Sequence, residues 1–391
     1  MRFLLVCTTF PPAFVYGGPP RANLGLAQGL KRLGHEVLVI TTDANGDKSL
    51  DVPKNVMTEV EGVPVIYLSC WHPKSYFFTP RLASEIAARR GQWDIGLLRG
   101  QWTYFNLLGS RLLSAMRMPY VVYPEGCLEP WALHHKGWKK VLYWRLVEKQ
   151  VYAHAAGVVS LTRREAEQVE AATHHRNVAI IPNGVSVEAL RNASSDSIVL
   201  PHGLANKRLI LFMSRIHRGK GLDLLVQAFG RISEEHPNYI LGIAGPSVDA
   251  EYDRKVRNFI MSFGLQERVV FIGPVYGQQR FALLRAADVF VLTSHSEGLP
   301  MAVLEAGACG VPVLITRACN LPEFEQAGAG IFVEASVDSV TDGLRRMLAD
   351  EGERRKMGAR ANELVSTRFT WDRVAEQTAA FCSSLLDSRA L

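Results

Sequence analysis

The sequence predicts an α/β fold made of two doubly wound, Rossmann-like domains, each built on a mainly parallel sheet. Short apolar runs typical of buried strands alternate with amphipathic helical patterns along the chain, which is the order expected of parallel sheets. The chain has 391 residues, of which 48% are hydrophobic, and this is enough for two domains of ordinary size. We expect a first domain over residues 1–186, a second over 187–368, and a terminal segment over 369–391.

A strand, a loop and a helix open the first half. We expect strands over residues 2–8 and 36–41, and the loop after the first strand ends in Gly17 and Gly18. Two glycines in front of a helix leave room for a ligand to approach closely, although a turn that requires positive φ would also explain them. The loop has no G-x-G-x-x-G motif, which disfavours a Rossmann dehydrogenase. The helix pattern that follows has Leu26, Leu30 and Leu33 on one face and ends at Gly34.

The second half opens in the same way. Residues 209–213 have the pattern of a buried strand, and the next loop contains Arg215 and Lys220. Both cations are therefore expected at the carboxyl end of a strand, where ligands bind in open α/β sheets. A planar guanidinium beside a flexible ammonium suits a diphosphate, and the alternative is an ordinary solvated basic loop. The helix after this loop has a period of about 3.6 residues, with apolar residues at Leu222, Leu225, Val226 and Phe229.

Two carboxylates, Glu297 and Glu305, lie on either side of a predicted helix start. Gly298 and Pro300 mark a tight turn, and the helix is expected to begin at or just after it. Glu305 is then about one and a half turns into the helix, beside small residues that permit close approach. A carboxylate there suits hydroxyl groups, and the free N–H groups at the helix start suit a phosphate. The segment predicts a nucleotide-sugar pocket, and the alternative is two solvated surface glutamates.

An ordered set of motifs in the second half resembles the retaining glycosyltransferases of family 4, which have the GT-B fold. The resemblance extends over almost the whole chain and is strongest over residues 209–315. An ordered set of motifs is far more specific than any one of them. The motifs are Ser-Arg-x4-Lys-Gly-x-Asp from Ser214, then Gly273, Ala287–Leu292, Glu-x7-Glu from Glu297, and Gly310–Val313.

The resemblance implies that the two domains face each other across a central cleft, with the nucleoside diphosphate sugar in the second domain and the acceptor in the first. Arg215 and Lys220 would act in catalysis by neutralising the departing diphosphate. Glu297 would be the catalytic group that orients the donor sugar, and Glu305 would hold the ribose hydroxyls. The family's chemistry is retaining hexosyl transfer and implies no metal and no cofactor besides the donor substrate. The other donor-binding residues that the resemblance implies are Gly17, Gly18, Gly298, Leu299, Pro300 and Met301.

The middle of the first half, residues 93–133, resembles a subgroup of the family that acts on lipid-linked or surface polysaccharide. A glycan or lipid-linked acceptor is therefore implied. The chain departs from the subgroup at two places: it has Arg99 at a strand end where a histidine is common, and Glu125 where a basic residue is usual. Arg99, Glu125 and Glu129 are acceptor-pocket candidates, and a structural role is the alternative for each.

The net charge of +6 comes entirely from the first half of the chain. Much of the excess lies over residues 136–149, where basic side chains interleave with Trp138, Tyr143 and Trp144. Such a segment predicts peripheral attachment to an anionic membrane surface, with packing of a long helix as the alternative because its cations do not share one face. We expect a nucleotide-sugar donor and no nucleic acid among the partners.

A cytoplasmic location, with the inner membrane face as a site of attachment, fits the rest of the composition. The apolar run of residues 1–7 is too short for a signal peptide, and no apolar run is long enough to span a membrane. Six cysteines occur without a C-x2-C pair, which favours a reduced protein without structural zinc. The histidine pairs at 134–135 and 174–175 lack partners at zinc-ligand spacing and are expected on the surface.

Five other functions share parts of this pattern. An exported sugar-binding receptor would show an export signal, and a non-enzymatic scaffold would be expected to have lost the glutamates and cations of the second half. A sugar phosphorylase or an epimerase of the same architecture, and a glycosyltransferase with a soluble acceptor, remain alternatives within enzymes. The use of a nucleotide sugar as donor would separate a transferase from a phosphorylase.

Overall fold

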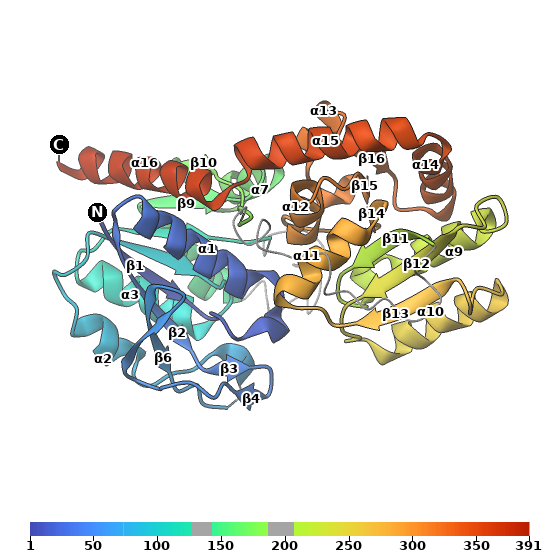
Figure 1. The fold of residues 1–391 in the computed structure, drawn as a ribbon. Coiled ribbons are helices and arrows are strands. Elements are labelled where there is room, and N and C mark those ends of the chain that lie inside the picture. Colours follow the sequence, from blue (N-terminus) through green and yellow to red (C-terminus); the bar gives the residue numbers. More distant parts are fainter. Residues whose placement is uncertain (73, 127–142, 187–206, 391) are drawn as a thin grey trace. The chain divides into compact units, whose positions relative to one another are not determined.

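The computed structural model describes residues 1–72, 74–126, 143–186 and 207–390, which form two compact units (Figure 1). Unit 1 consists of Met1–Gly184 and Trp371–Leu391, and unit 2 consists of Val185–Thr370. Each unit has its own mainly parallel sheet between helices, so the predicted α/β class with two Rossmann-like domains is confirmed. The terminal segment belongs to unit 1.

The sheet of unit 1 has eight described strands in the order β10-β9-β8-β7-β1-β2-β6-β5, and all neighbours are parallel except β5 and β6. Its central strands are apolar on both sides because helices cover both faces. The order reverses between β1 and β7, so the loops after these two strands diverge at the carboxyl edge. The strands are β1 (Arg2–Cys7), β2 (Glu36–Thr42), β5 (Met57–Val60), β6 (Val63–Leu68), β7 (Ile95–Arg99), β8 (Tyr120–Tyr123), β9 (Gly157–Ser160) and β10 (Val178–Ile180), with a separate pair, β3 (Ala44–Asn45) and β4 (Lys48–Ser49).

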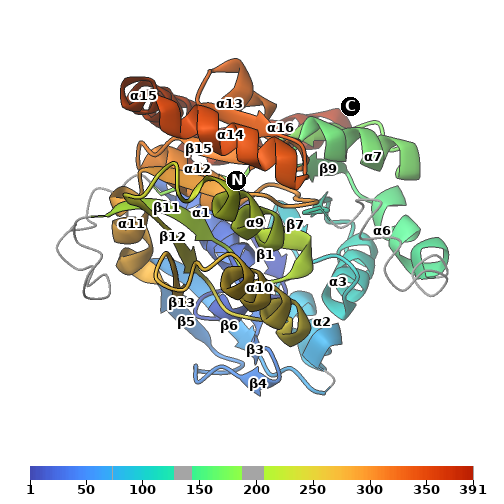
Figure 2. The ribbon, with the colours of Figure 1, turned by 90° about the vertical axis from the view of Figure 1, so that its right-hand side faces the viewer.

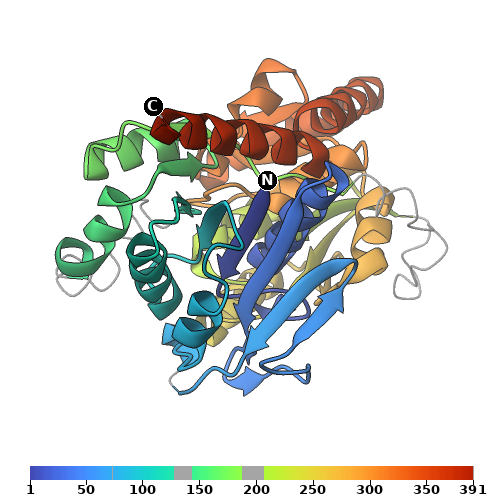
Figure 3. The ribbon, with the colours of Figure 1, turned by 90° about the vertical axis from the view of Figure 1, so that its left-hand side faces the viewer.

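Helix α16 returns to unit 1 from the far end of the sequence and lies along α1 (Figure 3). The packing is close because Gly25 and Gly29 of α1 leave room for Trp371, whose ring or backbone lies within 3 Å of where a Cβ would stand. The remaining helices follow the strands. They are η1 (Phe14–Tyr16), α1 (Gly18–Arg32), η2 (Lys74–Tyr76), α2 (Leu82–Ala87), α3 (Tyr104–Ala115), the π-helical η3 (Trp144–Glu148), α6 (Lys149–Ala153), α7 (Arg163–Thr173) and α16 (Trp371–Ala390).

The described part of unit 2 has a sheet of six parallel strands in the order β13-β12-β11-β14-β15-β16. Numbered within the unit, this is the order 3-2-1-4-5-6 of a doubly wound nucleotide-binding fold, and its topological switch point lies between β11 and β14. Ligands of such folds bind outside the carboxyl ends of the strands at this point. The strands are β11 (Arg208–Met213), β12 (Tyr239–Ala244), β13 (Val269–Gly273), β14 (Val289–Leu292), β15 (Val313–Thr316) and β16 (Gly330–Val333).

Helices cover both faces of this sheet. Helix α9 packs between α10 and α14 in one layer (Figure 2), and α12 packs between α11 and α15 in the other. The helices are η5 (Arg218–Lys220), α9 (Leu222–Ile232), α10 (Ala250–Ser262), α11 (Gly277–Ala286), α12 (Met301–Ala308), η6 (Arg317–Cys319), α13 (Pro322–Gln326), α14 (Val337–Ala349) and α15 (Glu351–Arg368).

The elements predicted from sequence are present with small shifts at their ends. Two details were wrong. Leu33, expected on the buried face of α1, lies just beyond the last helical residue and is 39% exposed. The Asn-Gly pair at Asn183 and Gly184 predicts a turn, but neither residue is in a turn or a helix.

Within the described ranges, no helix combines the length and apolar character needed to cross a membrane. The five cysteines in those ranges form no disulfide. Residues 136–142 of the basic aromatic segment, the pair His134–His135, and Cys127 lie outside the described residues.

Candidate functional site

The predicted donor residues of the second half gather at the switch point of unit 2. Strands β11 and β14 pair in parallel, with Ile210 opposite Val289, so the loops that follow them leave the same edge of the sheet. The first loop carries Arg215 and Lys220, and the second carries Glu297. The β-sheet therefore brings together side chains about 80 residues apart in the sequence.

Lys220 and Glu297 form a half-buried ion pair at this edge. The Nζ atom of Lys220 lies 2.6 Å from Oε1 of Glu297, and the side chains are 16% and 11% exposed. The hydroxyl of Ser294 donates to the same oxygen at 2.7 Å. The second carboxylate oxygen of Glu297 takes no part in these bonds. The pair places one cation and one carboxylate where a charged, hydroxyl-rich ligand would meet both.

Backbone contacts fix the Lys220 loop against the loop of Glu297. The N–H of His295 donates to the carbonyl of Gly219 at 2.9 Å, and the hydroxyl of Thr293 donates to the carbonyl of Gly221 at 2.8 Å. Gly221 has a φ of +63°, and a Cβ there would lie 2.0 Å from the Thr293 carbonyl oxygen. Only glycine fits this crossing point, so the local sequence of the loop is required by the approach of the second loop.

The turn that contains Glu297 is also held from its other side. Its N–H donates to the carbonyl of Ala318 at 3.0 Å, and the amide of Asn320 donates to its carbonyl at 2.6 Å. Both partners belong to the segment after β15. The position of the carboxylate is therefore set by three neighbouring strands.

Helix α12 begins at Met301, directly after Pro300, and carries Glu305 in its second turn. This agrees with the predicted helix start. Glu305 is 5% exposed, and Nη2 of Arg280, on α11, lies 3.2 Å from its Oε1 atom. Glu305 is thus a buried, paired carboxylate and is not a solvated helix-surface residue.

Arg215 differs from Lys220 because its side chain is exposed at the start of the loop. Its charge is nevertheless felt in the loop: burial, and then the positive charge of Arg215, lower the pKa of His217. Nδ1 of His217 accepts a hydrogen bond from the N–H of Gly219 at 3.1 Å, which the neutral ring permits. The loop is therefore an electropositive segment.

In unit 1, Gly17 and Gly18 stand at the start of α1, after the loop that follows β1. Gly17 has a φ of +81°, and a Cβ there would meet nothing within 4 Å. The positive φ alone explains why residue 17 is a glycine. The alternative explanation, a turn that requires positive φ, therefore also fits. Pro19 and Pro20 follow directly, and because proline has no N–H, the helix start offers fewer donors to an anion than expected.

The acceptor candidates Arg99 and Glu125 are brought together at the carboxyl edge of unit 1. Nε of Arg99 donates to Oε1 of Glu125 at 2.8 Å, and Nη2 donates to Oδ1 of Asn183 at 3.2 Å. Arg99 is 1% exposed, lies over the Tyr123 ring, and keeps Nη1 without a partner among the described residues. This burial suits a role in positioning Glu125. Glu129 lies outside the described residues.

A second buried carboxyl group, Glu148, lies in the π-helical segment η3. Its Oε1 accepts a hydrogen bond from the N–H of Trp102 at 2.8 Å, and its Oε2 has no partner among the described residues. Burial raises the pKa of Glu148 to about 7. Trp102 has a φ of +63°, a conformation that costs free energy in a non-glycine residue. π-Helical turns and such strain are common at functional sites.

Eight aromatic side chains form a cluster in unit 1 that includes Trp102, and Tyr152 is buried while the others are partly or fully exposed. They come from the loops after β6 and β7, the start of α3, the residues at η3 and helix α6, and neighbouring ring centroids are 4.7 to 6.3 Å apart. Trp71 is the most exposed of them. Aromatic rings with polar tips suit an amphipathic ligand. The set is Trp71, Tyr76, Phe78, Trp102, Tyr104, Tyr143, Trp144 and Tyr152.

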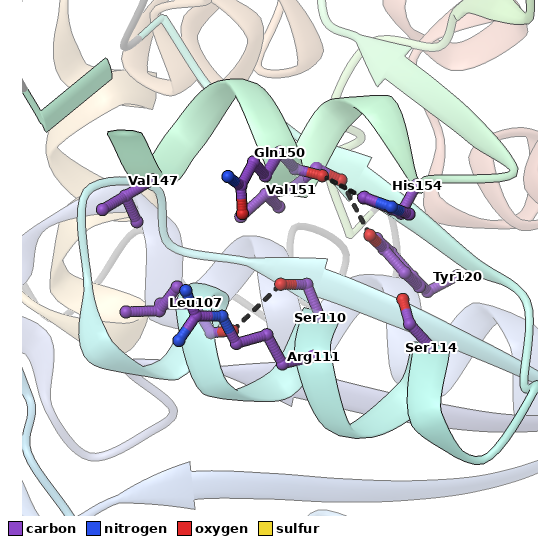
Figure 4. Close-up of a pocket in the computed structure, with 9 residues that line it drawn as sticks. All are labelled: Leu107, Ser110, Arg111, Ser114, Tyr120, Val147, Gln150, Val151 and His154. Atoms are coloured by element: carbon purple, nitrogen blue, oxygen red, sulfur yellow. Dashed lines mark hydrogen bonds between the residues drawn. The ribbon is translucent and has the colours of Figure 1, made fainter. Parts of the chain in front are cut away.

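A pocket of about 190 Å³ lies between α3 and α6 of unit 1 (Figure 4). It holds none of the residues predicted for the donor or acceptor. Several of its polar groups already bond to the backbone, since Ser110, Tyr120 and His154 each bond to a carbonyl oxygen. We assign it no ligand. Its lining is Leu107, Ser110, Arg111, Ser114, Tyr120, Val147, Gln150, Val151 and His154.

Sequence reasoning missed three residues of the unit 2 site: Arg280, Ser294 and Asn320. A sequence pattern could have indicated Arg280, because it directly precedes the apolar run 281–284 in a helix and so places a cation at a buried position. No sequence pattern indicates Ser294 or Asn320, since each acts through one hydrogen bond to Glu297. Among the described residues, no group of three His, Cys, Asp or Glu side chains is placed to hold a metal ion.

Two families match the chain, one in each half. Residues 17–184 match the family described as "Glycosyl transferase 4-like domain", and residues 200–364 match "Glycosyl transferases group 1". The two matches follow the division into units.

Relatives are similar along nearly the full length. The chain is 28% identical to an uncharacterized glycosyltransferase of Methanocaldococcus jannaschii, with 97% of each chain covered. It is 25% identical to the phosphatidylinositol N-acetylglucosaminyltransferase gpi3 subunit of Schizosaccharomyces pombe, over 96% of this chain and 79% of that one. The solved structure of HepE from Anabaena with UDP and glucose is 18% identical, with a TM-score of 0.77 over 98% of this chain and 100% of that one. The structural likeness identifies the GT-B fold.

We expect Glu148 to make the stability of the protein depend on pH. Its pKa of about 7 in the folded chain exceeds the ordinary value of 4.5, so the folded state holds a proton that the unfolded state has released. The contribution of Glu148 to the free energy of unfolding is then most favourable below the ordinary pKa. It falls by about 3 kcal/mol in total as the pH rises from the ordinary pKa through about 7. Urea unfolding of Glu148→Gln should lack this decline between pH about 5 and about 8.

The matched control is Glu170→Gln, an exposed glutamate on α7. It should follow the pH dependence of the wild type. Equal pH profiles for all three proteins would contradict a protonated Glu148.

Proposed function

The chain belongs to the glycosyltransferases of the family 4 type with the GT-B fold, and from this we propose that it moves a sugar from a nucleoside diphosphate sugar to a hydroxyl group, with retention of the anomeric configuration. The observation that carries the proposal is the Lys220–Glu297 ion pair at the switch point of unit 2. This is the place where a doubly wound fold binds a nucleotide. The cation and the carboxylate suit the two parts of the donor, its diphosphate and its sugar.

The ion pair gives a simple account of donor binding. The Nζ atom of Lys220 donates a hydrogen bond to Oε1 of Glu297 at 2.6 Å. A diphosphate carries more negative charge than one carboxylate, so it would draw the ammonium group away and free Oε1 of Glu297 for sugar hydroxyls. Arg215, exposed in the same loop, would add a second cation. Glu305 would accept hydrogen bonds from the ribose.

Charge stabilisation on the leaving group is the main catalytic effect that these residues offer. As the bond between the sugar and the phosphate oxygen breaks, Lys220 and Arg215 would stabilise the negative charge that develops on the diphosphate. The acceptor hydroxyl would attack from the same face, and its proton would pass to the departing phosphate oxygen. The two cations replace the charge that a divalent metal would supply, so we propose that the reaction needs none.

For the acceptor, we propose a glycan or lipid-linked glycan that binds unit 1 at the cytoplasmic membrane face. The aromatic side chains around Trp102 support an amphipathic acceptor. One full-length relative is named as a phosphatidylinositol N-acetylglucosaminyltransferase subunit, and HepE is described in complex with UDP and glucose. Arg99 and Glu125, which meet at the carboxyl edge of the unit 1 sheet, would line the acceptor pocket.

We predict that Lys220→Ala and Arg215→Ala each lower kcat/KM by roughly 100-fold or more, because each removes a charge that stabilises the leaving diphosphate. The assay would measure release of the nucleoside diphosphate from whichever nucleotide sugar stabilises the protein against heat. The control is Arg218→Ala in the same loop, since Arg218 is exposed and pairs with Asp249 at 2.9 Å. Near-normal turnover in the Lys220 or Arg215 variant would remove that residue from the diphosphate site.

The product should keep the anomeric configuration of the donor. NMR of the product anomeric proton, recorded during turnover without added Mg²⁺ and with a chelator present, would test both retention and metal independence. A sugar phosphorylase would instead require inorganic phosphate. An inverted product would contradict the proposed stereochemistry, and activity only with added metal would contradict the proposed role of the cations.

The protein should sediment with anionic vesicles at low ionic strength and be released by several hundred millimolar salt, because each basic residue near the surface contributes about 1 kcal/mol that salt screens. The combined change Lys136/Lys139/Lys140→Ser should weaken binding, whereas Lys356→Ser, an exposed lysine on α15, should not. Wild type that stays in the supernatant at low salt would favour a soluble acceptor.

A further inference from the structure

Arg280 is a buried cation that the proposed mechanism does not use. It lies in the first turns of α11, is 9% exposed, and stacks at 4.3 Å over the ring of Phe281. Among the described residues, its one ion pair joins Nη2 to Oε1 of Glu305 at 3.2 Å. Its Nε and Nη1 atoms are buried and have no hydrogen-bond partner in the same ranges. Two nitrogen atoms without partners on a buried guanidinium are unusual and call for a physical reason.

Packing alone does not explain this arginine. The residues that follow it, 281–284, are buried and apolar apart from their backbone, so an aliphatic side chain would fit the character of this face of α11. Buried ion pairs often cost more in desolvation than they return, and the unbonded N–H groups add to that cost. The reason for a buried arginine at this position is therefore its ion pair with Glu305.

Glu305 is a buried side chain that pairs with Arg280. It lies in α12 among the buried residues Val303, Leu304 and Ala306, and a charge in such apolar surroundings is destabilising unless an opposite charge pairs with it. An ionised carboxylate accepts hydroxyl hydrogen bonds about twice as strongly as a neutral group. The pair also fixes the carboxylate rotamer, because one oxygen is held at 3.2 Å.

We propose that Arg280 is a positioning residue of the donor site, which compensates the charge of Glu305 and holds its carboxylate oriented for the hydroxyl groups of the nucleotide ribose. The inference rests on the proposed function, since it takes Glu305 as the ribose contact. Arg280 acts through Glu305 and touches no reacting atom.

The test measures binding of UDP, GDP and ADP by calorimetry and continues with the one that the wild type binds most tightly. Arg280→Leu should weaken binding of that nucleoside diphosphate roughly ten-fold, because Glu305 loses the cation that pairs with it. Arg280→Lys, which keeps the charge, should retain most of the affinity. The control Arg346→Leu, an exposed arginine on α14 of the same unit, should bind as the wild type does.

Two further measurements separate positioning from a merely structural role. In a Glu305→Gln background, Arg280→Leu should cause no further loss, because its target has no charge to keep. The difference between wild type and Arg280→Leu should also shrink with the 2′-deoxy form of the same nucleoside diphosphate. These comparisons stay decisive if Arg280→Leu folds poorly, because Arg280→Gln, which removes the charge but keeps a polar side chain, supplies the same cycle in both Glu305 backgrounds.

Wild-type affinity in Arg280→Leu would overturn the inference. An equal loss for the ribo and 2′-deoxy nucleotides, or an equal loss with and without Glu305, would overturn it as well, because Arg280 would then act on the fold in general. If Glu305→Gln binds normally, the ribose assignment fails and the inference with it. If the wild type binds none of the three nucleotides, the proposed function itself fails.

Discussion

The parallel pairing of β11 with β14 is the constraint on which the donor site depends. These strands are separated in sequence by two complete strand-helix units, yet they are neighbours at the centre of the sheet of unit 2. Parallel strands end at the same edge, so the loops that carry Lys220 and Glu297 meet there. The close contact between Gly221 and Thr293 then sets the distance between the loops, and the 2.6 Å ion pair follows from it.

The same edge holds two acid-base pairs. The side chains of Lys220 and Glu297 are 16% and 11% exposed, and those of Arg280 and Glu305 are 10% and 6% exposed. Removing one partner of either pair would leave an uncompensated charge in largely apolar surroundings. Lys220 and Glu297 are the more exposed pair, so a charged ligand can reach them more easily.

Unit 1 shows a related arrangement at its own switch point. Arg99 ends β7 and is held by Glu125 and Asn183, while Glu148 accepts from the strained Trp102 nearby in the same unit. Each buried group keeps one atom without a partner among the described residues. Such groups cost stability, and their position at the edge where the strands end is consistent with an acceptor site, for which the sequence offered only weak candidates.

The sequence by itself determined the α/β class, both strand-loop-helix openings, the loops that contain Lys220 and Glu297, and the helix that contains Glu305. The reason is that the spacing of apolar residues and the positions of glycine and proline act on the local backbone conformation. It also identified the family, because several motifs occur in a fixed order. Only the tertiary structure decided which side chains pair. Lys220 meets Glu297, Glu305 meets Arg280, and Asn183 meets Arg99 instead of making a turn. These contacts depend on strand order and helix packing, which join residues far apart in the chain and leave no local pattern in it.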